Sequence, residues 1–272
     1  MVPWFEPTQM VRSADGTPIA VFTSGRGPDI VLVHGATADH TTFRVVRPLL
    51  EARFTIHAID RRGRGASGDA DPYAIEREFE DVAGVAEVLA AARGRPVDVV
   101  GHSYGGRCAL GAAVRSDAIR RVVSYEGAPT PGNETYQPDG LRERLRDHLA
   151  AGDRAAALET FMTEVVGMSA DDLERFRADP VWPARVAAAP TILRELEAET
   201  APAGSLETLG AVRQPVLQVL GGASLRPFHV ATAALDARLA DGRIAVIVDA
   251  RHAAHHTHPD AFVAAVAAFL AG

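Results

Sequence analysis

The sequence predicts one α/β domain, in which a mostly parallel sheet is covered by helices and interrupted by an all-helical insertion. Two observations lead to this prediction. Short β-branched runs alternate with amphipathic stretches, which is the pattern of parallel strands joined by crossover helices. This alternation stops between residues 128 and 213, where only helical patterns are found. We therefore expect residues 1–127 and 214–272 to form the core and residues 128–213 to form a helical cap.

Six apolar runs are expected to be strands: residues 30–33, 54–59, 97–100, 119–125, 216–220 and 244–248. Helical spacing separates several of them, as in Val82, Val85 and Leu89. Each run is followed by Gly, His, Asp or Glu. Since ligands of parallel sheets bind beyond the carboxyl ends of the strands, we expect the functional site at this edge.

Composition excludes several classes of function. The 272 residues carry a net charge of −7, and all 28 basic residues are arginine. The absence of lysine excludes Schiff-base aldolases, pyridoxal-phosphate enzymes, P-loop nucleotide hydrolases and Ser/Lys dyads. The negative charge disfavours nucleic-acid and anionic-membrane partners. Richness in alanine and arginine without lysine is consistent with a high-GC bacterial source.

The sequence also predicts where the protein resides. Its lone cysteine, Cys108, permits no internal disulfide, which fits a reducing compartment. The first residues show no signal-peptide pattern, and no apolar run approaches the length of a membrane span. We therefore expect a cytoplasmic protein that acts on a small molecule, and a homodimer is compatible with the sequence.

The insertion holds most of the charge. It contains 15 acidic and 9 basic residues, so −6 of the total lies there. Two interpretations stay open: a solvated helical surface, or mild repulsion of anionic substrates at the mouth of a pocket.

Residues 101–106 (GHSYGG) form the most informative motif. They follow an apolar run and precede a helical pattern, so the G-x-S-x-G pentapeptide predicts a tight strand-to-helix turn with Ser103 as the nucleophile. Two other motifs follow strands in the expected order, LVHG at 32–35 and DRRGRGAS at 60–67, and residues 252–262 end in HPDAF. On these residues the chain resembles the α/β-hydrolase family over almost its full length.

The resemblance implies an α/β-hydrolase fold, with an eight-stranded mostly parallel sheet and a helical cap inserted after the sixth strand. Attack on an ester or lactone carbonyl creates an oxyanion that needs two N–H donors. We expect these to be the backbone N–H groups of Tyr104 and Ala36.

Ten histidines compete for the role of general base. His252 is expected to be the base because it follows the last strand and precedes Pro259 and the final helix, as the family's histidine does. We interpret His255, His256 and His258 as a polar loop surface, because no H-E-x-x-H metal spacing is present. His34 and His102 are expected to be structural parts of their turns.

The acid departs from the pattern of most relatives, which carry an aspartate after the seventh strand. Ser224 stands there and cannot hold a charge beside an imidazolium. Glu126, at the end of the sixth strand, is the natural replacement and some family members are known to place their acid there. Asp249, Asp60 and a degenerate site remain alternatives.

Trp182, Phe43 and Met162 are candidates for the wall of the substrate pocket, with Phe228 as a further apolar candidate. Core packing is the competing interpretation of each. The Pro-Val-Trp segment and the Ser/Glu/His set are weakly similar to macrolactone hydrolases of the zearalenone type.

Together these features predict a serine hydrolase without cofactor or metal that cleaves an uncharged, largely apolar ester or lactone through an acyl-enzyme. The first alternative is a lyase, cyclase or cofactor-free oxygenase that uses Ser103 and His252 as acid and base. The second alternative is a catalytically silent ligand receptor.

Overall fold

The structure, a computed structural model, describes residues 6–132 and 134–272. Its eight strands form one sheet in the order β1-β2-β4-β3-β5-β6-β7-β8. β2 is antiparallel to β1 and β4, and every other pair is parallel. This confirms the predicted eight-stranded, mostly parallel sheet. The strands are β1 (Gln9–Arg12), β2 (Pro18–Gly25), β3 (Asp29–Val33), β4 (Thr55–Ile59), β5 (Val97–His102), β6 (Ile119–Tyr125), β7 (Val216–Gly221) and β8 (Gly242–Ile247).

Helices cover both faces of the sheet because successive strand residues point to opposite sides. In β3, Val31 and Val33 pack on one face, whereas Ile30 and Leu32 pack on the other. The first face is covered by α2 (Ile75–Arg93), α3 (Tyr104–Arg115), α9 (Leu206–Leu209) and α10 (Arg226–Asp236). The second is covered by α1 (Arg47–Glu51), α11 (Ala254–Thr257) and α12 (Pro259–Ala271), with the short η1 (His40–Phe43) beside them.

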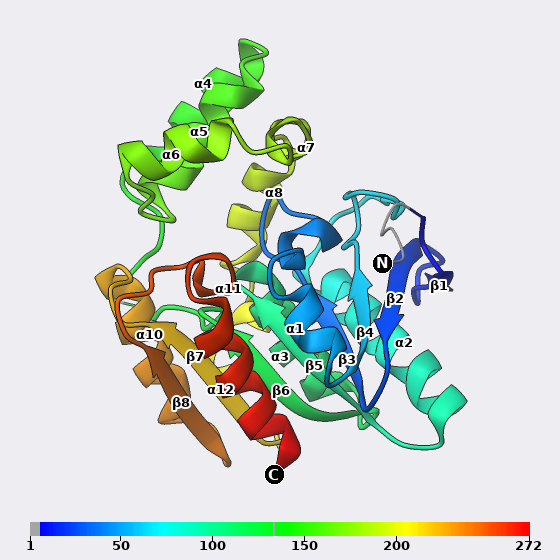
Figure 1. The fold of residues 1–272 in the computed structure, drawn as a ribbon. Coiled ribbons are helices and arrows are strands. Elements are labelled where there is room, and N and C mark those ends of the chain that lie inside the picture. The colour runs from blue at the N-terminus through cyan, green and yellow to red at the C-terminus, as the bar shows by residue number, and fades with distance from the viewer. Residues whose placement is uncertain (1–5, 133) are drawn as a thin grey trace.

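The described residues between β6 and β7 form helices and no strand. These helices are α4 (Leu141–Ala150), α5 (Arg154–Glu164), α6 (Ala170–Arg177), α7 (Trp182–Ala188), α8 (Thr191–Ala198) and η2 (Pro202–Gly204), followed by α9. Figure 1 shows α4 to α7 standing away from the sheet, with α8 leading back toward it. The insertion has its own apolar cluster, which includes Leu145, Leu158, Phe161 and Ile192. This cluster supports the predicted helical cap, whose bounds at residues 128 and 213 stay a prediction.

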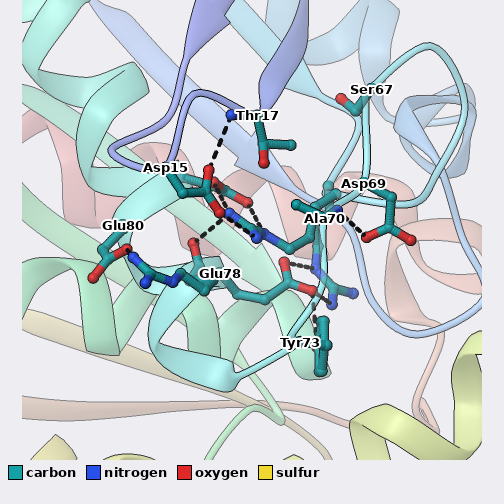
Figure 2. A network of polar contacts seen from close by, with 12 residues as sticks. Asp15, Thr17, Ser67, Asp69, Ala70, Tyr73, Glu78 and Glu80 are labelled. Atoms are coloured by element: carbon teal, nitrogen blue, oxygen red, sulfur yellow. Dashed lines mark hydrogen bonds and ion pairs between the residues drawn. The ribbon is translucent and has the colours of Figure 1, made fainter.

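Buried ion pairs surround the turn after β4. Arg61 and Arg62 follow β4 and are fully buried, and each is paired. Arg62 contacts Asp81 at 2.7 Å and Asp15 at 2.9 Å. Arg61 contacts Glu78 at 2.6 Å. Figure 2 shows Asp15 and Glu78 within this network, where the Tyr73 hydroxyl also donates to Glu78.

Glu195 of α8 joins this network from the insertion. Its carboxylate pairs with both Arg61 and Arg64. All three side chains are buried, so each charge depends on its partners. The turn after β4 is thereby fixed against α8. In the described part of the chain, no helix is long and apolar enough to cross a membrane.

Candidate active site

Ser103 occupies the tight turn between β5 and α3. Its backbone has φ +55° and ψ −125°, a conformation that L-residues rarely adopt. A Cβ on Gly101 would lie 2.2 Å from the carbonyl oxygen of Gly105, and one on Gly105 would lie 2.3 Å from that of His34. The two glycines of the motif are therefore required sterically, and the turn holds Ser103 in the wall of two cavities.

His252 and Glu126 are in direct contact. The imidazole Nδ1 lies 2.5 Å from Glu126 Oε2. The second carboxylate oxygen, Oε1, accepts hydrogen bonds from the Gly221 N–H at 2.7 Å and from the Ser224 hydroxyl at 2.6 Å. With the Nδ1 proton directed at Glu126, the Nε2 nitrogen of His252 is free to accept a proton.

The other carboxylates considered from the sequence are placed elsewhere. Asp60 is fully buried and accepts from the His40 and Ala66 backbone N–H groups, both at 2.8 Å. Asp249 is exposed, and its backbone has φ +60°. Of the three acids, the structure brings Glu126 to the imidazole of His252.

The two expected oxyanion donors border the same space as the serine. Ala36, Ser103 and Tyr104 line the smaller cavity together. The backbone N–H groups of Ala36 and Tyr104 have no acceptor among the described residues. A Cβ on Gly35 would lie 3.0 Å from Ser103 Cβ, so the loop after β3 lies directly against the nucleophile. The arrangement can hold an oxyanion formed at Ser103.

His34 and His102 support the turns around the serine. His34 Nδ1 donates to the Gly35 carbonyl at 2.8 Å, and its Nε2 accepts from the Arg61 N–H at 3.0 Å. His102 Nε2 lies 2.8 Å from the carbonyl oxygen of His252. Burial lowers the pKa of both rings, so they are neutral and structural at neutral pH.

His255 corrects the sequence interpretation of a polar loop surface. It is buried, because α11 turns its ring inward between those of Phe43 and Phe262. Burial lowers the pKa of His255, and it lowers that of His256 to about 4. No group of metal-ligating side chains that could hold an ion occurs among the residues described.

The two cavities meet at Ser103 and His252. The larger, of about 530 Å³, is walled by α5, α6, α7 and the segment from Asp249 to His258. This volume falls within the range of small-molecule sites. The smaller, of about 40 Å³, reaches toward Phe228. Met162 lines the larger cavity, where the sequence analysis expected it.

The expectations for Phe43 and Trp182 need correction. Phe43 is 1% exposed and packs in the core between the sheet and α12, outside both cavity walls. Trp182 packs edge-on against Phe176 at 5.2 Å between ring centroids, in the apolar cluster of the insertion. Both aromatic side chains therefore stabilise the fold, and α7 presents Arg185 to the larger cavity instead.

Two residues contribute to the site in ways that were not predicted from the sequence. Ser224 was considered only as the position of a missing acid, whereas the Ser224 hydroxyl donates to Glu126. Arg185 was not singled out, although an arginine three residues after Trp182 interrupts the apolar face of a helix rich in alanine and valine.

Comparisons with known proteins show the family of this chain. Residues 30–265 match the model of the alpha/beta hydrolase family. The chain is 29% identical over 252 residues to a 2-(acetamidomethylene)succinate hydrolase of Mesorhizobium japonicum, covering 90% of this chain and 89% of the relative. It is 28% identical over 265 residues to a pimeloyl-[acyl-carrier protein] methyl ester esterase of Chromobacterium violaceum, covering 92% and 97%.

Solved structures show the same architecture. An alpha/beta hydrolase from Sphaerobacter thermophilus superposes with a TM-score of 0.80 at 32% identity, covering 96% of this chain and all of the other. The enol-lactonase from Burkholderia xenovorans superposes with a TM-score of 0.78 at 21% identity, covering 97% and 100%.

Proposed function

The chain belongs to the α/β-hydrolase family of enzymes, and on that premise we propose that it is a serine hydrolase of carboxylic esters or lactones. Ser103 is the nucleophile, His252 the general base and Glu126 the acid that orients the base. The family relation supports hydrolysis. The roles of the three residues are supported by their arrangement at the carboxyl edge of the sheet.

Catalysis follows from the arrangement of donors and acceptors. Ser103 Oγ attacks the carbonyl carbon as its proton passes to His252 Nε2. The backbone N–H groups of Ala36 and Tyr104 hold the oxyanion. The imidazolium then protonates the leaving oxygen, and an acyl-enzyme forms on Ser103. Water activated by His252 releases the acid, and with a lactone the leaving hydroxyl remains part of the product.

One observation carries the assignment of the triad. Glu126 Oε2 lies 2.5 Å from His252 Nδ1, while Oε1 is satisfied by Gly221 and Ser224. A carboxylate held in this way fixes the ring orientation and stabilises the imidazolium. A surface glutamate at the start of the insertion would need neither the burial nor these partners.

A hydrolysis screen with aryl esters and macrolactones tests the proposal. Ser103→Ala and Glu126→Gln are compared with Glu207→Gln, an exposed carboxylate-to-amide change on α9. We expect turnover of at least one ester or lactone, with a loss of about 10³-fold or more in the first two variants and none in the third. Full turnover by Ser103→Ala would reject the proposal in favour of acid–base chemistry without a covalent step.

A further inference from the structure

Six arginines of the described chain are buried, and one of them lacks a counter-charge. Five have a carboxylate within ion-pair distance: Arg47, Arg61, Arg62, Arg64 and Arg107. The guanidinium of Arg185 makes no hydrogen bond or ion pair with any other described residue. Arginines are rarely buried without a partner, so this exception calls for an explanation.

Arg185 is 5% exposed and lines the larger cavity that Ser103 and His252 also line. The two carboxylates with the strongest influence on it are engaged elsewhere. Asp39 accepts from the Thr41 N–H at 2.9 Å, and Asp179 pairs with Arg44. These groups therefore leave the hydrogen-bonding positions of the guanidinium unfilled.

The guanidinium nevertheless stays charged. Burial, with Arg44 nearby, lowers the pKa of Arg185 to about 10, while Asp39 and Asp179 oppose this shift. A group with that pKa is protonated at neutral pH. A protonated guanidinium that faces a cavity and has no protein partner is available to a bound anion.

We propose that Arg185 binds a carboxylate carried by the substrate, while Ser103 attacks an ester or lactone carbonyl in the same molecule. This inference rests on the proposed hydrolase function and names its substrate class. It replaces the uncharged, largely apolar substrate that the sequence suggested. A planar guanidinium matches a carboxylate with two parallel hydrogen bonds, and it is the side chain best suited to that geometry.

The charge of the cavity fits a single negative group. Four arginines and three aspartates line it, so its formal charge is +1. The neighbouring His255 and His256 are neutral, because burial lowers the pKa of both. A dianionic phosphate would leave one charge uncompensated, whereas one carboxylate balances the cavity.

The negative charge of the insertion does not oppose this proposal. Of its fifteen acidic residues, only Asp172 and Asp179 line the larger cavity. Asp172 pairs with Arg175 at 2.5 Å, and Asp179 pairs with Arg44. Other acidic residues pair with arginines on the outer surface, as Glu159 does with Arg177. The excess charge is therefore a property of the solvated surface.

Matched substrates test the inference. The probes are 4-nitrophenyl hemiesters of succinic, glutaric and adipic acid, beside the corresponding primary amides, with uncatalysed hydrolysis subtracted. We expect the wild type to prefer an acid over its amide. Arg185→Gln should lower kcat/KM for the acid about 10- to 100-fold more than for the amide, mainly through KM. Arg177→Gln, an exposed arginine on α6 outside the cavity wall, serves as the matched control.

The possible outcomes distinguish the inference about Arg185 from the proposed hydrolase function. A preference that is lost in Arg185→Gln and kept in Arg177→Gln supports the inference. Equal losses on acid and amide, or no preference in the wild type, overturn it while the hydrolase function stands. If no ester is turned over above the Ser103→Ala background, the proposed function fails instead.

A binding measurement keeps the inference testable in that last case. Thermal unfolding is followed with glutaramate, which carries one carboxylate, and with the neutral glutaramide at constant ionic strength. Glutaramate should raise the Tm of the wild type and of Arg177→Gln, but not that of Arg185→Gln. Equal shifts in wild type and Arg185→Gln, or no shift in either, would overturn the inference independently of catalysis.

Discussion

In the proposed triad, Glu126 takes the role that an aspartate after the seventh strand has in most α/β hydrolases, and Ser224 stands at the position of that aspartate. The carboxylate comes from the end of β6 and reaches His252, while the hydroxyl after β7 donates to the same carboxylate. Glu126 also has φ +48°, an unusual backbone conformation that directs the chain into the insertion. The proposed acid therefore lies at the end of the strand next to β7, and Ser224 after β7 donates a hydrogen bond to it.

This arrangement predicts that an aspartate at position 224 can replace the carboxylate of Glu126. Glu126→Gln alone should lower kcat about 10³- to 10⁴-fold, because an amide cannot stabilise the imidazolium. Adding Ser224→Asp should restore about tenfold or more of that loss, since residue 224 already touches the carboxylate that contacts His252. Steady-state kinetics on one ester compares the two variants. A double variant no faster than Glu126→Gln would show that Ser224 does not lie within reach of the imidazole.

The absence of a partner for Arg185 should affect the stability of the ligand-free protein. Arg185→Gln removes a buried charge and leaves no carboxylate unpaired, so the free energy of unfolding should stay equal or rise by about 1 kcal/mol. Arg62→Gln, which strands Asp81 and Asp15, should lower it by about 3–5 kcal/mol. Urea denaturation measures both. A comparable loss in Arg185→Gln would mean that its guanidinium is paired in solution.

At the scale of elements, local sequence predicted the buried central strands well. The bounds of β6 agree with the predicted run, because Val122, Val123 and Tyr125 are buried between helices on both faces. β1 and β2 were implied only by the family resemblance. In β1 only Val11 is buried, so this edge strand carries no apolar run. β2 does carry a buried apolar run, residues 19–22, but the sequence analysis did not single it out.

The site residues also differ in how far the sequence could predict them. Ser103 lies in a local motif whose glycines dictate the turn, and His252 was singled out because its position resembles that of the family's histidine. The importance of Arg185 depends on which carboxylates fail to reach it, which only the tertiary structure determines. Trp182 looked more promising in the sequence, but the packing of α7 against α6 turns it toward Phe176.

The link between α8 and the turn after β4 predicts a stability effect. Glu195→Gln leaves Arg61 and Arg64 without their shared carboxylate, so unfolding should become easier by about 3–5 kcal/mol. Glu197→Gln, an exposed change on the same helix, should cost less than about 1 kcal/mol. Urea denaturation followed by circular dichroism compares the two. Equal effects would contradict a structural role for the buried pair.

For the whole molecule, the net charge of −7 differs in sign from the formal charge of the larger cavity. The larger cavity carries a formal charge of +1, although it lies beneath an insertion of charge −6. The solvated acidic surface and the cavity therefore have opposite signs. The positive charge of the larger cavity should attract a small anion.

Buried neutral histidines predict how stability depends on pH. Burial lowers the pKa of five of them: His34, His57, His102, His255 and His256. In the unfolded chain each would take up a proton near pH 6.5, so the unfolded state binds more protons below that value. Stability should therefore fall as the pH drops from about 6.5 to about 4.

Two carboxyl groups oppose this trend. The pKa of Asp81 is raised to about 6 and that of Glu199 is also raised, in both cases mainly by burial. They bind protons in the folded state first and so favour folding in the same window, but they are outnumbered by the histidines. Urea denaturation at about pH 7.5, 6 and 5 measures the net effect. Stability that stays constant or rises over this range would contradict the expected balance.

Labelling with a fluorophosphonate shows whether Ser103 forms a covalent bond during the reaction. Intact-mass spectrometry and peptide mapping follow the adduct while residual ester hydrolysis is measured on the same sample. We expect one phosphonyl group per chain, located on Ser103, with activity lost in proportion to labelling and no adduct in Ser103→Ala. Undiminished hydrolysis by fully labelled enzyme, or an adduct on another residue that alone abolishes activity, would contradict it.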